Sequence, residues 1–169
     1  MVGLSLCVLV ASGLLAWSLA RDDSYVVPVP HAAQPSVEPG AADATLAVFE
    51  RAVRRGDAEA ARALAPTGDA ATADLLAALV HNAVALRVAD FTLRYVSDDG
   101  APAADGSWTA SADVTWRFRG FDRTVARAEV AVDLIDDGDR VALTGFGGHG
   151  RVSPVWLAGA AEVRRTPST

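Results

Sequence analysis

The first clear pattern of hydrophobic and polar positions along the chain is helical. Leu46, Phe49 and Val53 recur every three or four residues, while charged side chains occupy the opposite side. Asp43 belongs to the residue types that cap helix N-termini, and Gly56 suits the left-handed position that follows a helix C-terminus. The pattern therefore predicts an amphipathic helix between Asp43 and Gly56.

Two further helices are predicted after this one. Asp57 can cap a short helix with the sequence AEAARALA, which Pro66 ends because proline lacks a backbone N–H. An apolar pattern over residues 73–88 predicts a third helix with one broad hydrophobic face. His81 lies about opposite the centre of that face, so we expect it to be exposed. The face comprises Leu75, Leu76, Leu79, Val80, Ala83 and Leu86.

After residue 89 the hydrophobic period changes to two, which is typical of strands with one buried face. The alternation predicts strands over residues 90–96, 107–119, 126–134 and 140–146, and DDGD before the last strand predicts a tight hairpin. The predicted inner face comprises Phe91, Leu93, Tyr95, Trp108, Ala110, Ala112, Val114, Trp116, Phe118, Ala126, Ala128, Val130, Val132 and Leu134. The face predicted to be solvated includes Thr109, Ser111, Asp113, Thr115, Arg117, Arg127 and Glu129.

Helices followed by antiparallel strands predict an α+β layer architecture. The helical hairpin ATLAVFERAVRRGDAEAARALAP, the stretch HNAVALRVADFTLRYV and the long strands after it resemble the NTF2-like (SnoaL-like) superfamily. The resemblance covers residues 43–148, and it implies three N-terminal helices packed on a curved antiparallel sheet that forms a cone. Residues 149–169 form a C-terminal extension, in which we expect one more short strand.

Residues 1–20 contain no charged side chain, and a helix of that length reaches roughly 30 Å, the thickness of a bilayer's hydrocarbon core. We expect a transmembrane anchor here, and the alternative is a signal peptide cleaved after Ala20. Arg21, the first basic residue, follows the apolar run. By itself it would hold the C-terminal end of the segment in the cytoplasm. We prefer a true start upstream with a basic leader. Residues 21–42 carry four prolines and predict an extended tether.

The charge balance argues against nucleic-acid binding. The chain has 21 acidic residues against 15 basic ones, a net charge of −6, and the charges are interspersed. Cys7 is the only cysteine, so no intrachain disulfide can form. With nucleic acid excluded, the expected partners are the membrane, through the apolar residues 1–20, and either a second copy of the chain or another envelope protein.

Candidate catalytic and metal-binding residues are few. Enzymes of the resembled superfamily place an Asp, His or Tyr inside the cone, where burial tunes the group for proton transfer. Here Asp113 alternates outward, His81 points away from the helical apolar face, and only Tyr95 shares the inner face. The three histidines, His31, His81 and His149, are far apart in sequence. We therefore predict no catalytic residue, no cofactor and no metal.

Large apolar side chains remain as candidates for lining a pocket. They either fill the interior as core, line a ligand pocket or form a dimer face. The candidates are Phe49, Leu79, Phe91, Tyr95, Trp108, Trp116, Phe118 and Val132. We predict a non-catalytic, single-pass membrane protein whose extracytoplasmic domain acts as a binding or spacing module. The alternatives are a SnoaL-like small-molecule enzyme and the N-terminal part of an envelope protease-like assembly, as in related membrane-anchored actinobacterial proteins.

Overall fold

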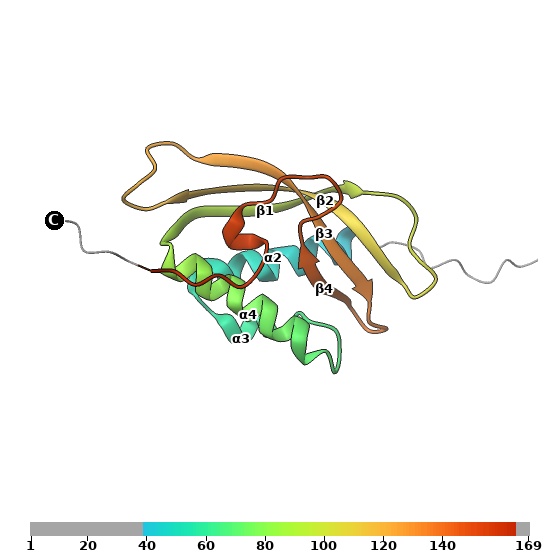
Figure 1. Cartoon of the computed structure of the whole chain (residues 1–169). Helices are drawn as coiled ribbons and strands as arrows, with labels where there is room; N and C mark the ends of the chain where they lie inside the picture. The colour runs from blue at the N-terminus through green and yellow to red at the C-terminus, as the bar shows by residue number, and fades with distance from the viewer. Residues whose placement is uncertain (1–38, 165–169) are drawn as a thin grey trace, which may run out of the picture. The chain divides into compact units, whose positions relative to one another are not determined.

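Three α-helices open the part of the chain that the computed structural model describes, residues 39–164 (Figure 1). Helix α2 spans Pro39–Arg55, α3 spans Ala58–Arg62 and α4 spans Ala70–Ala85. The hydrophobic pattern predicts all three helices, and the structure differs from that prediction mainly in where α2 and α4 begin.

Helix α2 begins at Pro39, ahead of the expected cap Asp43, so the last residues of the predicted tether are helical. Proline suits the first helical position, where its missing N–H would have no intrahelical partner. Packing then holds the first turn in place. Ala42 is fully buried, and the Thr45 hydroxyl donates a hydrogen bond to the Val141 carbonyl at 2.8 Å.

Aspartate caps fix the starts of α3 and α4. The Asp57 carboxylate accepts a hydrogen bond from the Ala60 amide at 3.0 Å, which confirms the predicted cap. The Asp69 carboxylate accepts one from the Thr72 amide, also at 3.0 Å. Because Asp69 satisfies an otherwise unpaired N–H, α4 starts at Ala70 and not at residue 73.

Four antiparallel strands follow in the order β1-β2-β3-β4. They span Val88–Asp98, Ser107–Phe118, Ala126–Asp136 and Val141–Phe146. Gly138, with a φ of +85°, lies in the tight turn between β3 and β4 and confirms the predicted hairpin. The described part is therefore α+β, with three helices and one four-stranded antiparallel sheet.

Strand register confirms the predicted inner face of the sheet. Trp108 pairs with Leu134 and Ala112 with Val130, and each of these side chains is buried. Their neighbours one position along point to the other side, because successive strand residues alternate. This outer face carries Asp113, which is half-buried.

Ser111 was expected to be solvated with its outer-face neighbours, and that prediction is wrong, since only 2% of Ser111 is exposed. Its hydroxyl donates to the Glu129 carboxylate at 2.7 Å, and the Arg151 Nε donates to the same oxygen at 3.1 Å. The chain after β4 therefore folds back over this part of the outer face. Ala131, the strand partner of Ser111, is fully buried as well.

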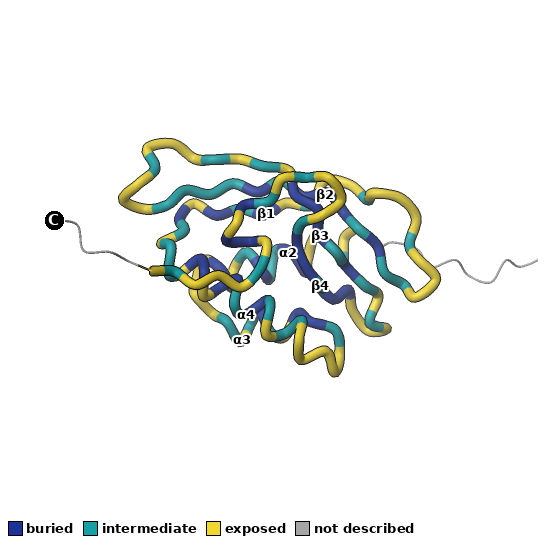
Figure 2. Tube along the Cα trace, viewed as in Figure 1, coloured by how far each residue is buried: buried dark blue, intermediate teal, exposed yellow. Residues whose placement is uncertain are grey.

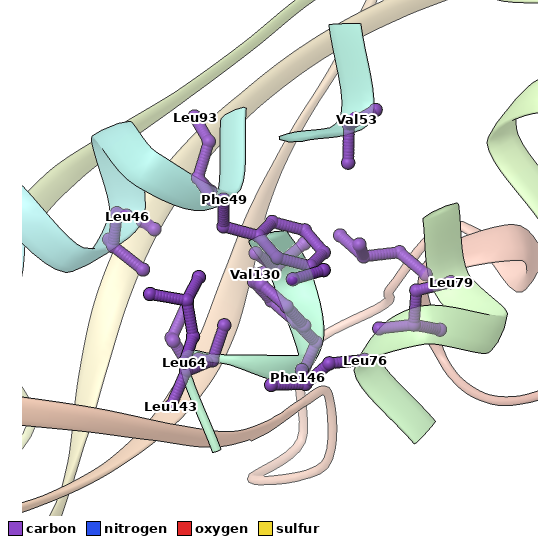
Figure 3. Packing of buried hydrophobic residues seen from close by; sticks show 14 of the residues in the cluster. Leu46, Phe49, Val53, Leu64, Leu76, Leu79, Leu93, Val130, Leu143 and Phe146 are labelled. Carbon is purple, nitrogen blue, oxygen red and sulfur yellow. The ribbon is translucent and has the colours of Figure 1, made fainter. Parts of the chain in front are cut away.

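The hydrophobic core lies between the helices and the inner face of the sheet, where the buried stretches of α2, α4 and the strands turn toward one another (Figure 2). Phe49 of α2 is at its centre (Figure 3). Its ring lies 5.0 Å from that of Phe146, centroid to centroid, in a tilted arrangement. Leu46, Leu79 and Val130 surround it and are almost fully buried, so helices and sheet share one continuous core.

The short strand expected in residues 149–169 is wrong for the described part of that stretch. Val155–Leu157 instead form one turn of 3-10 helix, η1, preceded by the buried Pro154. A strand would point Trp156 and Leu157 to opposite faces. A helical turn buries both side chains, which are 1% and 0% exposed.

The predicted anchor, residues 1–20, lies outside the described residues, as does most of the predicted tether. Between residues 39 and 164, none of the helices combines the length and the apolar character needed to cross a bilayer.

Candidate functional site

Most of the predicted pocket-lining residues are packed core. Phe49, Leu79, Phe91 and Val132 are each at most 2% exposed. Side chains this buried contact protein atoms on all sides, so they leave no room for a ligand among them. Trp108 is 7% exposed and also belongs to the core cluster, but one edge of it borders a surface hollow described below. Tyr95, Trp116 and Phe118 are half-buried and pack against the edge of the core.

The indole of Trp156 fills the space against the first strand. Its ring lies 5.3 Å from Phe91, centroid to centroid, at 75° in an edge-to-face arrangement. Edge-to-face packing is a favoured geometry for aromatic pairs. Leu157 beside it belongs to the same hydrophobic cluster. The C-terminal segment, which we define as residues 147–161, thus contributes the side chains that complete the interior.

Asn82 of α4 holds the C-terminal segment in place. Its side-chain amide donates to the carbonyls of Trp156 at 3.0 Å and Gly159 at 2.8 Å. Its oxygen accepts from the Ala161 amide at 3.2 Å. Only 3% of Asn82 is exposed, so these bonds satisfy the polar atoms of a buried side chain.

Sequence reasoning missed Asn82, although a signal was present. On the helical wheel Asn82 falls at the edge of the apolar face of its helix, beside Leu75 and Leu86. A lone amide in that position needs a hydrogen-bond partner from elsewhere in the fold. The pattern alone does not say that the partner is the segment around Trp156.

Tyr95, the only titratable residue predicted on the inner face, is not suited to acid–base work. Burial and a hydrogen bond from its hydroxyl to the Asp98 carboxylate raise the pKa of Tyr95 well above its usual range. The phenol therefore stays protonated at neutral pH. Its hydroxyl makes a local contact with Asp98, three residues further along the same strand.

The other predicted titratable residues lie outside the core, as expected. Asp113 forms an ion pair with Arg127 on the outer face, and Asp90 forms one with Arg117. His81 is exposed on α4. None of these groups reaches the interior, where a general acid or base of the SnoaL type would have to lie.

A hollow of about 540 Å³ with a mixed polar and apolar lining lies where the loop after β1 meets the start of β2 and the last part of β3. His149 and Trp108 are among its lining residues. The His149 Nε2 lies 3.1 Å from an Asp133 carboxylate oxygen and 3.3 Å from the Thr109 hydroxyl. Because both contacts involve the same ring nitrogen, the histidine does not link an acid to a nucleophile as a catalytic triad requires.

Metal binding finds no support in the described residues. Nowhere in residues 39–164 do three or more His, Cys, Asp or Glu side chains gather in a way that could hold a metal ion. Of the three histidines, His31 lies outside the described residues, and His81 and His149 are on α4 and on the loop after β4.

A second hollow, of about 430 Å³, lies at the end of the fold where α2 and α4 finish. Four arginines line it: Arg54, Arg55, Arg87 and Arg119. No acidic residue is among its lining residues, which otherwise include Gly56 and several apolar side chains. We call it the arginine hollow.

Comparison with known proteins does not add a family to this geometry. No protein-family model matches the sequence, and no curated protein shows significant similarity to it. The arguments about function therefore rest on the residues themselves.

Proposed function

We propose that the folded part of this chain is a non-catalytic binding or spacing module of the NTF2-like type, with a filled cone and its recognition surfaces on the outside. The observation that carries this proposal is the burial of Trp156 against Phe91, with Leu157 buried in the same cluster. In an enzyme or carrier built on such a cone, that space would hold the small molecule.

The competing SnoaL-like enzyme needs a polar group inside the cone. Asp113 and His81 are the two residues whose inward orientation would favour it, and both lie outside the core. The buried polar side chains of the described part are Thr45, Asn82 and Ser111. Thr45 bonds to the Val141 carbonyl, Ser111 bonds to Glu129 on the outer face, and the hydrogen bonds of Asn82 hold the C-terminal segment. An amide that is fully hydrogen-bonded to backbone is a structural group.

We further propose that residues 1–20 anchor the module in the cell membrane as a single-pass segment, with the domain extracytoplasmic. The support is the length of the run and its lack of charge. Membrane fractionation of the expressed chain tests this part. Recovery of the whole chain in the soluble fraction, beginning at Arg21, would show cleavage instead.

Binding of an apolar fluorescent probe without charge, such as Nile red, tests the filled interior. Adding the native chain should not raise the probe's fluorescence in a saturable way. The control is a peptide that lacks residues 39–164, measured under the same conditions. Trp156→Gly, which empties the space beside Phe91, should create such binding. Saturable binding to the unaltered chain, competed by small apolar molecules, would identify an open pocket and contradict the proposal.

A further inference from the structure

The arginine hollow is built from parts of the chain that are far apart in sequence. Arg54 and Arg55 come from the last turn of α2, Arg87 follows α4, and Arg119 follows β2. The Arg119 amide donates to the Arg87 carbonyl at 3.0 Å, so these two residues are fixed side by side.

The backbone at this end of the fold adopts conformations that most residues avoid. Gly56 has a φ of +68°, and Arg87, a residue with a side chain, has a φ of +56°. The Gly56 amide donates to Val53 and the Asp57 amide to Ala52, so a compact turn closes α2 and brings its last residues toward α4. Residues of these turns line the hollow.

Three of the four guanidinium groups have no acidic partner among residues 39–164. Arg54 forms an ion pair with Glu50 at 3.2 Å, whereas no ion pair with a described carboxylate involves Arg55, Arg87 or Arg119. In contrast, Arg62, Arg117, Arg127, Arg140, Arg151 and Arg164 are all paired. Arg51, Arg94 and Arg123 are also without an ion pair among residues 39–164, but none of them lines the hollow, which brings together the other three unpaired arginines.

Helix electrostatics account for only part of this cluster. The C-terminal ends of α2 and α4 carry partial negative charge, which favours the basic residues Arg54, Arg55 and Arg87 nearby. Arg119 belongs to the sheet and follows a strand, so the helix ends do not explain its presence. Bringing like charges together costs free energy that a bound anion would offset.

We propose that the arginine hollow binds a phosphate group. Guanidinium groups match phosphate oxygens through paired N–H donors, and a phosphate can accept from three guanidinium groups at once, which a single carboxylate does less well. The volume of about 430 Å³ accommodates a phosphate together with a small substituent. This site is separate from the filled interior and does not depend on it.

The phosphate can come from a soluble molecule or from a lipid headgroup. Next to the hollow, the turn between β2 and β3 carries Phe121, which is 83% exposed, between Arg119 and Arg123. The carboxylate of Asp122 in the same turn accepts from the Phe118 amide at 2.7 Å, so it is turned toward its own backbone. An exposed aromatic ring beside arginines suits contact with a phospholipid surface.

The test measures phosphate binding to the full-length chain in a neutral detergent. Inorganic phosphate is titrated by calorimetry at constant ionic strength, and a parallel titration uses detergent micelles doped with phosphatidylglycerol. Arg87→Gln and Arg119→Gln should each weaken binding about tenfold or more, because each removes a charged donor. Arg94→Gln is the matched control: Arg94 is exposed on β1, has no ion pair with a described carboxylate and does not line the hollow.

The outcomes separate the sources and the alternatives. Binding of inorganic phosphate that the two hollow variants lose and Arg94→Gln keeps supports the proposal with a soluble ligand. Binding only to phosphatidylglycerol, weakened by the hollow variants and by Phe121→Ser, supports it with a lipid headgroup. The proposal is overturned if neither inorganic phosphate nor phosphatidylglycerol binds. It is also overturned if all three arginine variants weaken binding equally. Because the probe experiment on the interior uses a different site, either proposal can fail without the other.

Discussion

Replacing Trp156 by alanine is the sharpest perturbation of this fold. Trp156 is 1% exposed and packs edge-to-face on Phe91. Truncating a buried tryptophan removes its transfer free energy and leaves a cavity, which together cost about 3–5 kcal/mol. Its indole N–H has no hydrogen-bond partner among the described residues, and losing an unpaired donor returns part of that cost. We therefore expect a loss of about 3–4 kcal/mol, a large share of the total stability.

Urea unfolding followed by far-UV circular dichroism measures this loss without relying on tryptophan fluorescence. With a urea m-value of about 2 kcal/mol/M, the unfolding midpoint should fall by about 1.5–2 M. Val155→Ala is the matched control, because Val155 is in the same 3-10 turn and is 83% exposed. It should change the free energy of unfolding by less than about 0.5 kcal/mol.

A second substitution keeps the experiment informative if Trp156→Ala does not fold. Trp156→Phe retains an aromatic ring and removes the unpaired N–H, so it should cost less than about 2 kcal/mol. If Trp156→Ala unfolds within about 1 kcal/mol of the unaltered chain, the C-terminal segment does not complete the core. The argument for a filled interior would then be wrong.

Three further predictions concern single positions elsewhere in the fold. Asn82→Leu should lose about 2–3 kcal/mol in urea unfolding, because two carbonyls and one amide of the C-terminal segment lose their partner, and hydrogen exchange should speed up in that segment alone. Trp116→Ala should cost clearly less than Trp156→Ala in the same assay, since Trp116 is only half-buried; an equal cost would mean that the sheet closes over it. Hydrogen bonds from the Thr67 hydroxyl and amide lower the pKa of Asp137, so its stabilising effect is present above its unfolded pKa of about 4 and is lost as the pH falls. Thr67→Ala should therefore reduce the loss of stability below about pH 4, and an unchanged acid titration would contradict this assignment.

Local periodicity predicted the sheet well. Successive residues of a strand face opposite sides of the sheet, so a two-residue period in the sequence shows which residues share a face. Trp108, Ala112 and Val130 were placed on the inner face in this way. The cap at Asp57 was also visible in sequence, because it acts on an amide three residues away. Such contacts are short in sequence, so a local pattern contains them.

Contacts made by the returning chain could not be predicted in this way. Ser111 is buried because Glu129 and Arg151 lie over it, and nothing in the alternation of its own strand shows that. The burial of Trp156 depends on where residues 147–161 come back to the helices. The short strand expected in the C-terminal extension does not form in its described part, where tertiary packing selects a helical turn at Val155–Leu157 instead.

The candidate site shows the same limit. The sequence offered aromatic side chains as pocket-lining residues because size and polarity are readable position by position. Whether such residues meet a ligand or one another depends on volumes supplied by distant segments, here Trp156 against Phe91. The arginine hollow was not predicted for a related reason: Arg55, Arg87 and Arg119 each look like isolated surface charges until the fold assembles them.

The hydrogen bonds from Asn82 join residues 74 to 79 positions apart, which has a consequence for the order of folding. Closing so long a loop costs entropy before any contact repays it, so docking of residues 147–161 should follow assembly of the helices and the sheet. Until then Phe91 and its neighbours are exposed to water, in a species prone to aggregate. Contacts formed after the transition state slow unfolding more than they speed folding. The lifetime of the native domain is therefore governed by how rarely this last segment detaches.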